Sequence, residues 1–228
     1  MLKFIGRGSA FNPKEGNNCA YIKQNKNLIL FDCGANIFER IINKDLLNNV
    51  DNVHVFVTHT HADHVGSLGS LIDYVYYILK NKTNVYCGDA KLAELLKLQK
   101  ISEEVYNFYH NEDAYLYSID NMEIKFYKTK HIGDDCYGII INLSDGSCID
   151  YSGDSSEITN LNLFLHGTNY LYQDISTNDF EGNVHVSYRK LCDLIPQEHR
   201  KRVYIMHING DFNIEKATLE GFNVVTLD

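Results

Sequence analysis

The chain has 228 residues, the length of one folded domain, since chains usually divide into separate cores only beyond roughly 250 to 300 residues. Hydrophobic residues make up 44% of it, and no apolar run approaches the roughly 18 residues of a membrane-spanning helix. With 21 basic and 30 acidic residues the net charge is -9, which argues against an extended nucleic-acid surface. Six scattered cysteines without CxxC spacing, and an N-terminus without an apolar secretory segment, predict a soluble cytoplasmic protein with no membrane partner.

The predicted elements alternate between strands and helices after a mostly antiparallel start in each half. In the first half, short apolar runs predict strands at 2–5, 20–23, 28–31, 53–58 and 84–87. Helices are expected from about 35, at 65–79 and at 90–98, followed by a Tyr-rich helical or irregular piece up to about 110. No Pro/Gly/Ser linker separates the halves, so we expect a single domain over 1–228.

In the second half, strands are expected at 114–119, 123–127, 137–143, 147–150, 170–174, 203–206 and 223–226. Helices are expected after Asp154 and from Ser187, whose side chain could cap the helix. The pattern predicts two βα halves, packed sheet to sheet with the helices outside.

The strongest chemical signal is the segment THTHADH at 58–64, directly after a β-branched strand. His59, His61, Asp63 and His64 place four potential metal ligands within six residues. One tetrahedral ion cannot comfortably take all four, whereas two ions roughly 3.5–4 Å apart can. The motif therefore predicts a binuclear metal site.

Further ligands must then come from strand ends downstream. His131 lies in a loop between two strands, Asp154 ends the segment CIDYSGD, and His207 follows the strand RVYIM. Gly153 allows a sharp turn before Asp154, whose carboxylate could bridge two cations. These positions add three candidates to the four of the motif.

These segments resemble the metallo-β-lactamase superfamily: THTHADHVGSL, KHIGDDCYG, YSGD and MHI occur in that order. The opening GRGSAFNPKEGNNCAYI and the segment LILFDCG resemble its ribonuclease Z-like phosphodiesterase branch. The resemblance implies an α/β metallo-β-lactamase fold, an αβ/βα four-layer sandwich, with two divalent metal ions, zinc or manganese. One ion would be held by His59, His61 and His131 and the other by Asp63, His64 and His207, with Asp154 bridging.

The same resemblance separates a proton-transfer pair from the ligands. His185, in VHVS, would give a proton to the leaving oxygen, and Asp174, in YQDIS, would orient its imidazole. Many relatives carry Glu in a His-Glu-Ala-Thr setting where this chain has Asp174. With Asp63, these residues are the expected catalytic set.

The expected substrate is a small phosphodiester. In this branch, transfer-RNA 3′-processing nucleases carry a long arm between the third metal histidine and the bridging aspartate, but His131 and Asp154 are only 23 residues apart. Armless relatives include cyclic-nucleotide phosphodiesterases, among them phage and bacterial anti-Pycsar proteins that destroy cyclic-nucleotide immune signals. We therefore expect a cyclic mononucleotide as substrate and no extended nucleic acid as partner.

Three alternatives remain open from the sequence: a transfer-RNA 3′-processing endonuclease, a thioester or lactone hydrolase, and a non-catalytic nucleotide-binding module. The resemblance also implies a homodimer, for which the Tyr-rich stretch 74–117 is the expected interface.

Overall fold

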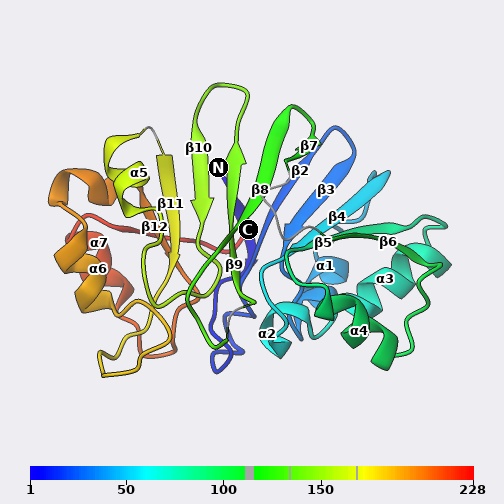
Figure 1. Cartoon of the computed structure of the whole chain (residues 1–228), viewed down its shortest axis with the longest axis horizontal. Coiled ribbons are helices and arrows are strands. Elements are labelled where there is room, and N and C mark those ends of the chain that lie inside the picture. The colour runs from blue at the N-terminus through cyan, green and yellow to red at the C-terminus, as the bar shows by residue number, and fades with distance from the viewer. Residues whose placement is uncertain (111–115, 134, 168) are drawn as a thin grey trace. The chain divides into compact units, whose positions relative to one another are not determined.

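The computed structural model of the chain describes residues 1–110, 116–133, 135–167 and 169–228. It divides into two compact units: the first comprises Met1–Asp113 with Thr226–Asp228, and the second Ala114–Val225. Each unit has one mixed β-sheet with helices against it (Figure 1). Whether 1–228 behaves as a single domain stays a prediction. None of the helices in the described ranges has the length and apolar character needed to cross a membrane.

The first unit contains a six-stranded sheet in the order β1-β2-β3-β4-β5-β6. Its strands are β1 (Lys3–Gly6), β2 (Cys19–Gln24), β3 (Asn27–Phe31), β4 (Asn52–Val57), β5 (Thr83–Cys87) and β6 (Tyr106–His110). The first three pair antiparallel and β3 to β6 pair parallel. The antiparallel start followed by parallel strands agrees with the alternation predicted from the sequence. Parallel pairing puts the carboxyl ends of β3, β4 and β5 at one edge.

The helices of the first unit cover one face of its sheet. They are α1 (Ile37–Asn43), α2 (Ala62–Val65), α3 (Leu68–Tyr77) and α4 (Lys91–Leu98). In α3, Leu68, Leu71, Ile72 and Val75 recur at helical spacing and are buried in the core with the apolar residues of β3 and β4. The helix expected at 65–79 forms as α3, and Gly66 and Ser67 separate it from α2, which ends at Val65. The Ser67 hydroxyl donates to the Gly34 carbonyl at 2.5 Å.

The expectation of a helical or irregular piece up to about residue 110 is wrong at its end, where β6 forms. This strand pairs parallel with β5, and the Tyr109 ring stacks on Tyr86 with centroids 4.8 Å apart. Tyr86 in turn stacks on Phe56 of β4 at 4.3 Å. Such cross-strand aromatic contacts stabilise a strand through residues distant in sequence, so the local pattern does not reveal them.

The second unit contains a seven-stranded sheet in the order β13-β12-β11-β10-β9-β8-β7. Its strands are β7 (Tyr117–Ile119), β8 (Met122–Lys128), β9 (Tyr137–Asn142), β10 (Cys148–Tyr151), β11 (Asn169–Asp174), β12 (Val203–Met206) and β13 (Asn223–Val224). Strands β7 to β10 pair antiparallel and β10 to β13 parallel. Of the strand expected at 114–119, residues 114 and 115 lie outside the described residues.

The helices of the second unit pack on one face of its sheet, around a core that includes Phe164, Leu171, Leu191 and Ile205. They are α5 (Leu161–His166), α6 (Tyr188–Leu194), the 3-10 helix η1 (Gln197–Arg202) and α7 (Ile214–Leu219). As expected, Ser187 caps α6, its Oγ accepting from the backbone N–H of Lys190 at 3.1 Å. The sequence predicts neither η1 nor α7, since six residues are too few for a clear helical period.

A cross-strand pair in the second unit depends on a glycine. Tyr127 on β8 lies opposite Gly138 on β9, and a Cβ atom at position 138 would overlap the Tyr127 ring. The Tyr127 hydroxyl donates to Asp150 at 2.5 Å, and Asn160 donates to the other carboxylate oxygen at 3.1 Å. The pKa of Asp150 is raised to about 6, because burial raises it by more than the two donors lower it. The ring is therefore held at its hydroxyl and cannot swing aside without leaving a buried carboxylate short of a donor.

We expect Gly138→Ala to lower the free energy of unfolding by about 1–3 kcal/mol, the usual cost of overfilling a packed site. Urea denaturation measures this. The matched control is Gly69→Ala in α3, where the new Cβ meets the flexible end of Gln99 and alanine favours the helix. Equal stability of the two variants would contradict the account of the Tyr127 contact.

Candidate metal centre and proton-transfer pair

In the first unit, the predicted ligand motif occupies the loop between β4 and α2. His59 and His64 are buried, and the Asp63 side chain is 12% exposed. His59 Nε2 lies 3.0 Å from His61 Nδ1, and His64 Nε2 lies 3.3 Å from Asp63 Oδ2. Two nitrogen ligands of one tetrahedral ion are separated by roughly 3.3 Å. The four residues of the motif therefore come together as two close pairs.

Asp32, directly after β3, organises two of these histidines. Its carboxylate accepts from the Thr58 N–H at 2.8 Å and from the Thr58 hydroxyl, and it lies 2.8 Å from His64 Nδ1. Since the Thr58 hydroxyl donates to Asp32, its oxygen can accept from His59 Nδ1 at 3.1 Å. Both imidazoles then carry their proton on Nδ1 and present the Nε2 lone pair, the form in which histidine binds a metal. The pKa of Asp32 is raised, because burial raises it by more than the contact with His64 lowers it.

The backbone around Asp32 fixes the start of α2. Asp32 has φ of 69°, a left-handed conformation that aspartate tolerates better than most residues. The Cys33 N–H donates to the His64 carbonyl at 2.7 Å. A side chain at Gly34 would overlap the Asp63 carbonyl, so glycine allows this close approach. The loop after β3 thus places Asp63 and His64 through the backbone as well as through Asp32.

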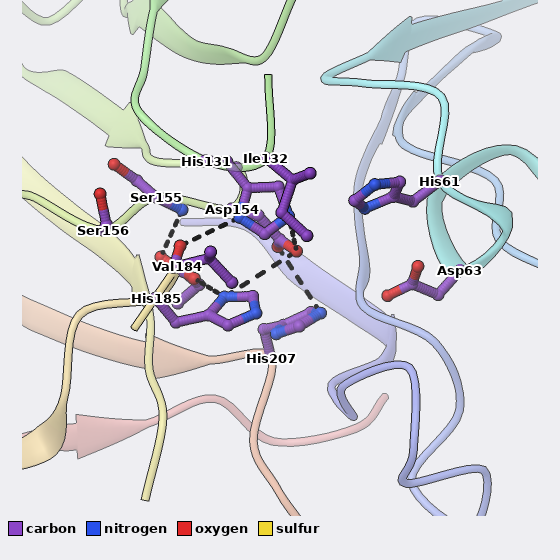
Figure 2. Close-up of polar contacts among 12 residues, drawn as sticks. His61, Asp63, His131, Ile132, Asp154, Ser155, Ser156, Val184, His185 and His207 are labelled. Carbon is purple, nitrogen blue, oxygen red and sulfur yellow. Dashed lines mark hydrogen bonds and ion pairs between the residues drawn. The ribbon is translucent and has the colours of Figure 1, made fainter. Parts of the chain in front are cut away.

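In the second unit, Asp154 lies between two histidines (Figure 2). Its Oδ2 is 3.7 Å from His131 Nε2, and its Oδ1 is 3.5 Å from His207 Nε2. All three side chains are at most 3% exposed. Each oxygen of the carboxylate therefore faces a different imidazole, an arrangement that suits a carboxylate bridging two cations.

His131 and His207 reach Asp154 from separate strand ends. His131 follows β8, and its Nδ1 donates to the Val184 carbonyl at 3.0 Å, which again leaves the lone pair on Nε2. Burial lowers the pKa of His131, so the neutral, metal-binding form is favoured at neutral pH. His207 follows β12 with a left-handed φ of 55°.

His185 and Asp174 form the expected pair. Asp174 ends β11 and is fully buried, and its Oδ2 lies 2.6 Å from His185 Nδ1. The shorter aspartate thus reaches the imidazole. Burial raises the pKa of Asp174, and the hydrogen bond from His185 opposes that shift. The His185 side chain is 23% exposed, so its ring is accessible to a proton acceptor outside the protein.

The donor set fits divalent metal ions within each unit. The first unit supplies imidazole nitrogens oriented by Asp32 and Thr58, and the second supplies a buried carboxylate between imidazoles. Imidazole and carboxylate ligands with such supporting hydrogen bonds are typical of zinc and manganese sites. Donor atoms of Asp154, Asp174, His185 and His207 all lie within 4.8 Å of one another. The assignment of each residue to an ion stays a prediction.

Two supporting residues were not among the expected site residues. Asp32 lies in LILFDCG and Gln173 in YQDIS, each a polar residue at the carboxyl end of an apolar strand. A polar residue at the carboxyl end of an apolar strand could have indicated a supporting role, because neighbouring parallel strands bring their carboxyl ends together. Gln173 Nε2 donates to Asp174 Oδ1 at 2.7 Å.

We expect Asp32→Asn to weaken metal binding by about 10- to 100-fold, because it removes the charge that orients His64 and raises its basicity. Asparagine keeps the size and tolerates the left-handed backbone. Competition with a chromophoric chelator measures the affinity. The control is Asp51→Asn, which changes an exposed aspartate paired with Lys26. Unchanged affinity in Asp32→Asn would show that this carboxylate does not support a ligand.

The family model described as Anti-Pycsar protein Apyc1 matches residues 1–225. The Anti-Pycsar protein Apyc1 of Bacillus phage BSP38 is 26% identical over 229 residues, covering 91% of this chain and 88% of that protein. Ribonuclease Z of Methanocaldococcus jannaschii is 30% identical over 139 residues, covering 57% of this chain and 44% of that protein.

Solved structures give the fold. The metallo-β-lactamase fold protein YhfI of Bacillus subtilis aligns with a TM-score of 0.76 at 18% identity, covering 100% of this chain and 95% of that one. The short form of human tRNase Z aligns with a TM-score of 0.72 at 16% identity, covering 100% and 96%. The metallo-β-lactamase fold expected from the sequence is thereby confirmed. With residues 1–225 matched by one family model, the chain belongs to the Anti-Pycsar Apyc1 family.

Proposed function

We propose that this protein is a binuclear metal-dependent phosphodiesterase that hydrolyses a cyclic mononucleotide, in keeping with a role against cyclic-nucleotide immune signals. The observation that carries the proposal is the arrangement of carboxylates and imidazoles in the second unit. A carboxylate placed between two imidazoles, Asp154, lies beside a separate carboxylate and imidazole pair, Asp174 and His185. In this proposal, different groups carry metal ligation and proton transfer, as suits the hydrolysis of an ester with a poor leaving group.

The metal set we propose is the one that the resemblance to the metallo-β-lactamase superfamily implies. His59, His61 and His131 would hold one ion, Asp63, His64 and His207 the other, and Asp154 would bridge them. When bound, two divalent cations neutralise the charge that develops on the phosphoryl oxygens. Zinc is the expected metal and manganese the alternative, since both accept nitrogen and oxygen ligands. Asp63 and Asp154 would also offset part of the positive charge.

His185 would act as general acid. Its Nδ1–H donates to Asp174, so in the protonated imidazole Nε2 carries the proton that can be given away. Water forms the new bond to phosphorus and releases a proton to solvent as the phosphorus–oxygen bond of the cyclic diester breaks. The departing alkoxide takes the proton of His185 Nε2, and the ring becomes neutral. The Asp174 carboxylate favours the charged form of the imidazole before transfer and fixes the ring orientation.

The interval between His131 and Asp154 supports a small substrate. It contains β9 and β10, which pair antiparallel, and the turn between them at 143–147. Outside residue 134, this leaves no additional element that could act as an RNA-gripping arm. A transfer-RNA precursor is therefore the second candidate substrate, favoured only by the partial similarity to ribonuclease Z.

The test is incubation of the metal-loaded protein with 2′,3′- and 3′,5′-cyclic nucleotides, a model diester and a transfer-RNA precursor. We expect cyclic nucleotides to be opened to monophosphates. His185→Ala should lower kcat by about 100- to 10,000-fold, the usual effect of losing a general acid, with unchanged metal content. Chromatography of the products and metal analysis of the same preparation give both readings.

The control is His61→Ala, which should lose metal and activity together. Recovery of intact nucleotide after denaturing the wild-type protein would indicate a nucleotide-binding module. Hydrolysis of thioesters or lactones alone would assign a different substrate class. Loss of metal in His185→Ala would make His185 a ligand instead of an acid.

We further propose a homodimer. Within the expected interface stretch 74–117, of which 111–115 lie outside the described residues, large apolar side chains are exposed at the end of α3. Tyr77 is 56% and Ile78 60% exposed, and Leu98 at the end of α4 is 79% exposed. Large apolar side chains exposed to solvent are one feature of surfaces that bind another protein.

We expect light scattering to give twice the chain mass of 26.2 kDa for the wild type and a monomer for Ile78→Glu. Burying an unpaired carboxylate at an interface is unfavourable. The control is Leu219→Glu in α7, where the residue is 82% exposed and belongs to the second unit. A monomeric wild-type protein would contradict the proposal.

A further inference from the structure

The Asp174 carboxylate has contacts that metal binding and proton transfer do not use. While Oδ2 faces His185, Oδ1 accepts from Gln173 Nε2 at 2.7 Å and from the Ser155 N–H at 3.2 Å. Asp174 is fully buried, so its orientation depends on the groups packed around it. Both oxygens of the carboxylate thus contact hydrogen-bond donors of the second unit.

Gln173 contacts Asp174 twice with one amide group. Its Nε2 donates to Asp174 Oδ1 and also to the Asp174 backbone carbonyl at 3.0 Å. An amide nitrogen carries two protons, so both bonds can form at once. Holding the backbone oxygen and the side-chain oxygen of one residue restricts rotation of its side chain about the Cα–Cβ bond. Asp174 Oδ2 is thereby kept in one direction.

This arrangement leaves Gln173 Oε1 without a hydrogen-bond partner among the described residues, although the side chain is completely buried. Turning the amide over would point that oxygen at two other acceptors, which is worse. A buried amide oxygen without a partner is unfavourable, and a leucine would fill a similar volume without it. Packing therefore does not explain an amide at this position, whereas the two bonds to Asp174 do.

Ser155 links the two members of the pair. Its N–H donates to Asp174 Oδ1, and its carbonyl accepts from the Val186 N–H at 2.8 Å, next to His185 in the chain. The backbone of Ser155 therefore contacts both the Asp174 carboxylate and the chain next to the His185 imidazole. Besides Ser155, Oδ1 has the Gln173 amide at 2.7 Å and the Ser152 hydroxyl at 3.4 Å. That hydroxyl has one proton and donates it to the Gly153 carbonyl at 2.6 Å, so Gln173 is the stronger side-chain donor to Oδ1.

We propose that Gln173 is a positioning residue for the proton-transfer step. It holds Asp174 so that Oδ2 points at His185 Nδ1, which keeps His185 Nε2 directed at the leaving oxygen of the substrate. The inference rests on the proposed function, in which His185 is the general acid. An aspartate has only one methylene, so its reach to the imidazole depends on accurate placement.

The variant Gln173→Leu tests this with two substrates. For a 3′,5′-cyclic nucleotide, whose alkoxide needs a proton to leave, we expect kcat to fall about 10-fold with unchanged KM and metal content. For bis(p-nitrophenyl) phosphate, whose phenolate leaves without protonation, the loss should be below about 2-fold. Equal losses on both substrates would overturn the proposal.

A double-mutant cycle separates positioning from a structural effect. If Gln173 acts through His185, Gln173→Leu should cause no further loss in the His185→Ala background. A full additional loss there would overturn the proposal. The matched control is Thr83→Val in β5 of the first unit. It also removes a buried polar atom that has no hydrogen-bond partner in the described ranges, and it should leave both rates unchanged.

A readout without substrate distinguishes this inference from the proposed function. In zinc-loaded protein labelled with ¹⁵N-histidine, the Nδ1 proton of His185 should give a slowly exchanging NMR signal that is missing in His185→Ala. We expect that signal in the wild type and in Thr83→Val, and its loss through exchange in Gln173→Leu. An unchanged signal in Gln173→Leu would overturn the positioning role. If Gln173→Leu loses the signal but the wild-type protein opens no cyclic nucleotide, the positioning role of Gln173 is supported and only the phosphodiesterase activity is refuted.

Discussion

Three buried aspartates at strand ends each need hydrogen-bond donors or cations close to their carboxylate. Asp32, Asp154 and Asp174 are at most 3% exposed. A carboxylate removed from water must be compensated by donors or cations inside the protein. In each unit, the carboxyl edge of the parallel strands supplies these partners, because successive loops start there. The histidines are therefore held in defined orientations by the same interactions that allow the carboxylates to be buried.

The surroundings of Asp154 and Asp174 distinguish two roles for one residue type. Both oxygens of Asp174 contact N–H donors at 2.6–3.2 Å, within hydrogen-bonding distance. The oxygens of Asp154 lie 3.5 and 3.7 Å from imidazole nitrogens, too far for hydrogen bonds but suited to ligands that share cations. We therefore treat Asp154 as the candidate ligand and Asp174 as the support of His185, although their donor atoms lie in one cluster.

Much of the fold could be predicted from local patterns. The apolar run at 53–57 gave β4, and Ser187 was recognised as the cap of α6 because a polar residue precedes the helix. The strand β6 was missed although its aromatic residues favour a strand, and the structure pairs it parallel with β5 and stacks Tyr109 on Tyr86. The helix expected at 65–79 was recognised from its apolar spacing, and α3 forms within that range at Leu68–Tyr77.

The sequence by itself determined which chemistry the chain can carry, because HxHxDH and the polar residues after strands define the donor types and their positions along the chain. The tertiary structure alone decided how those donors are used within each unit. That Asp32 orients His64, that Val184 orients His131 and that the Ser155 N–H donates to Asp174 depends on which strands pair and which loops meet. These contacts join residues up to 53 positions apart, so no local pattern records them. Hydrogen bonds act over about 3 Å in space, and only the folded chain sets such distances.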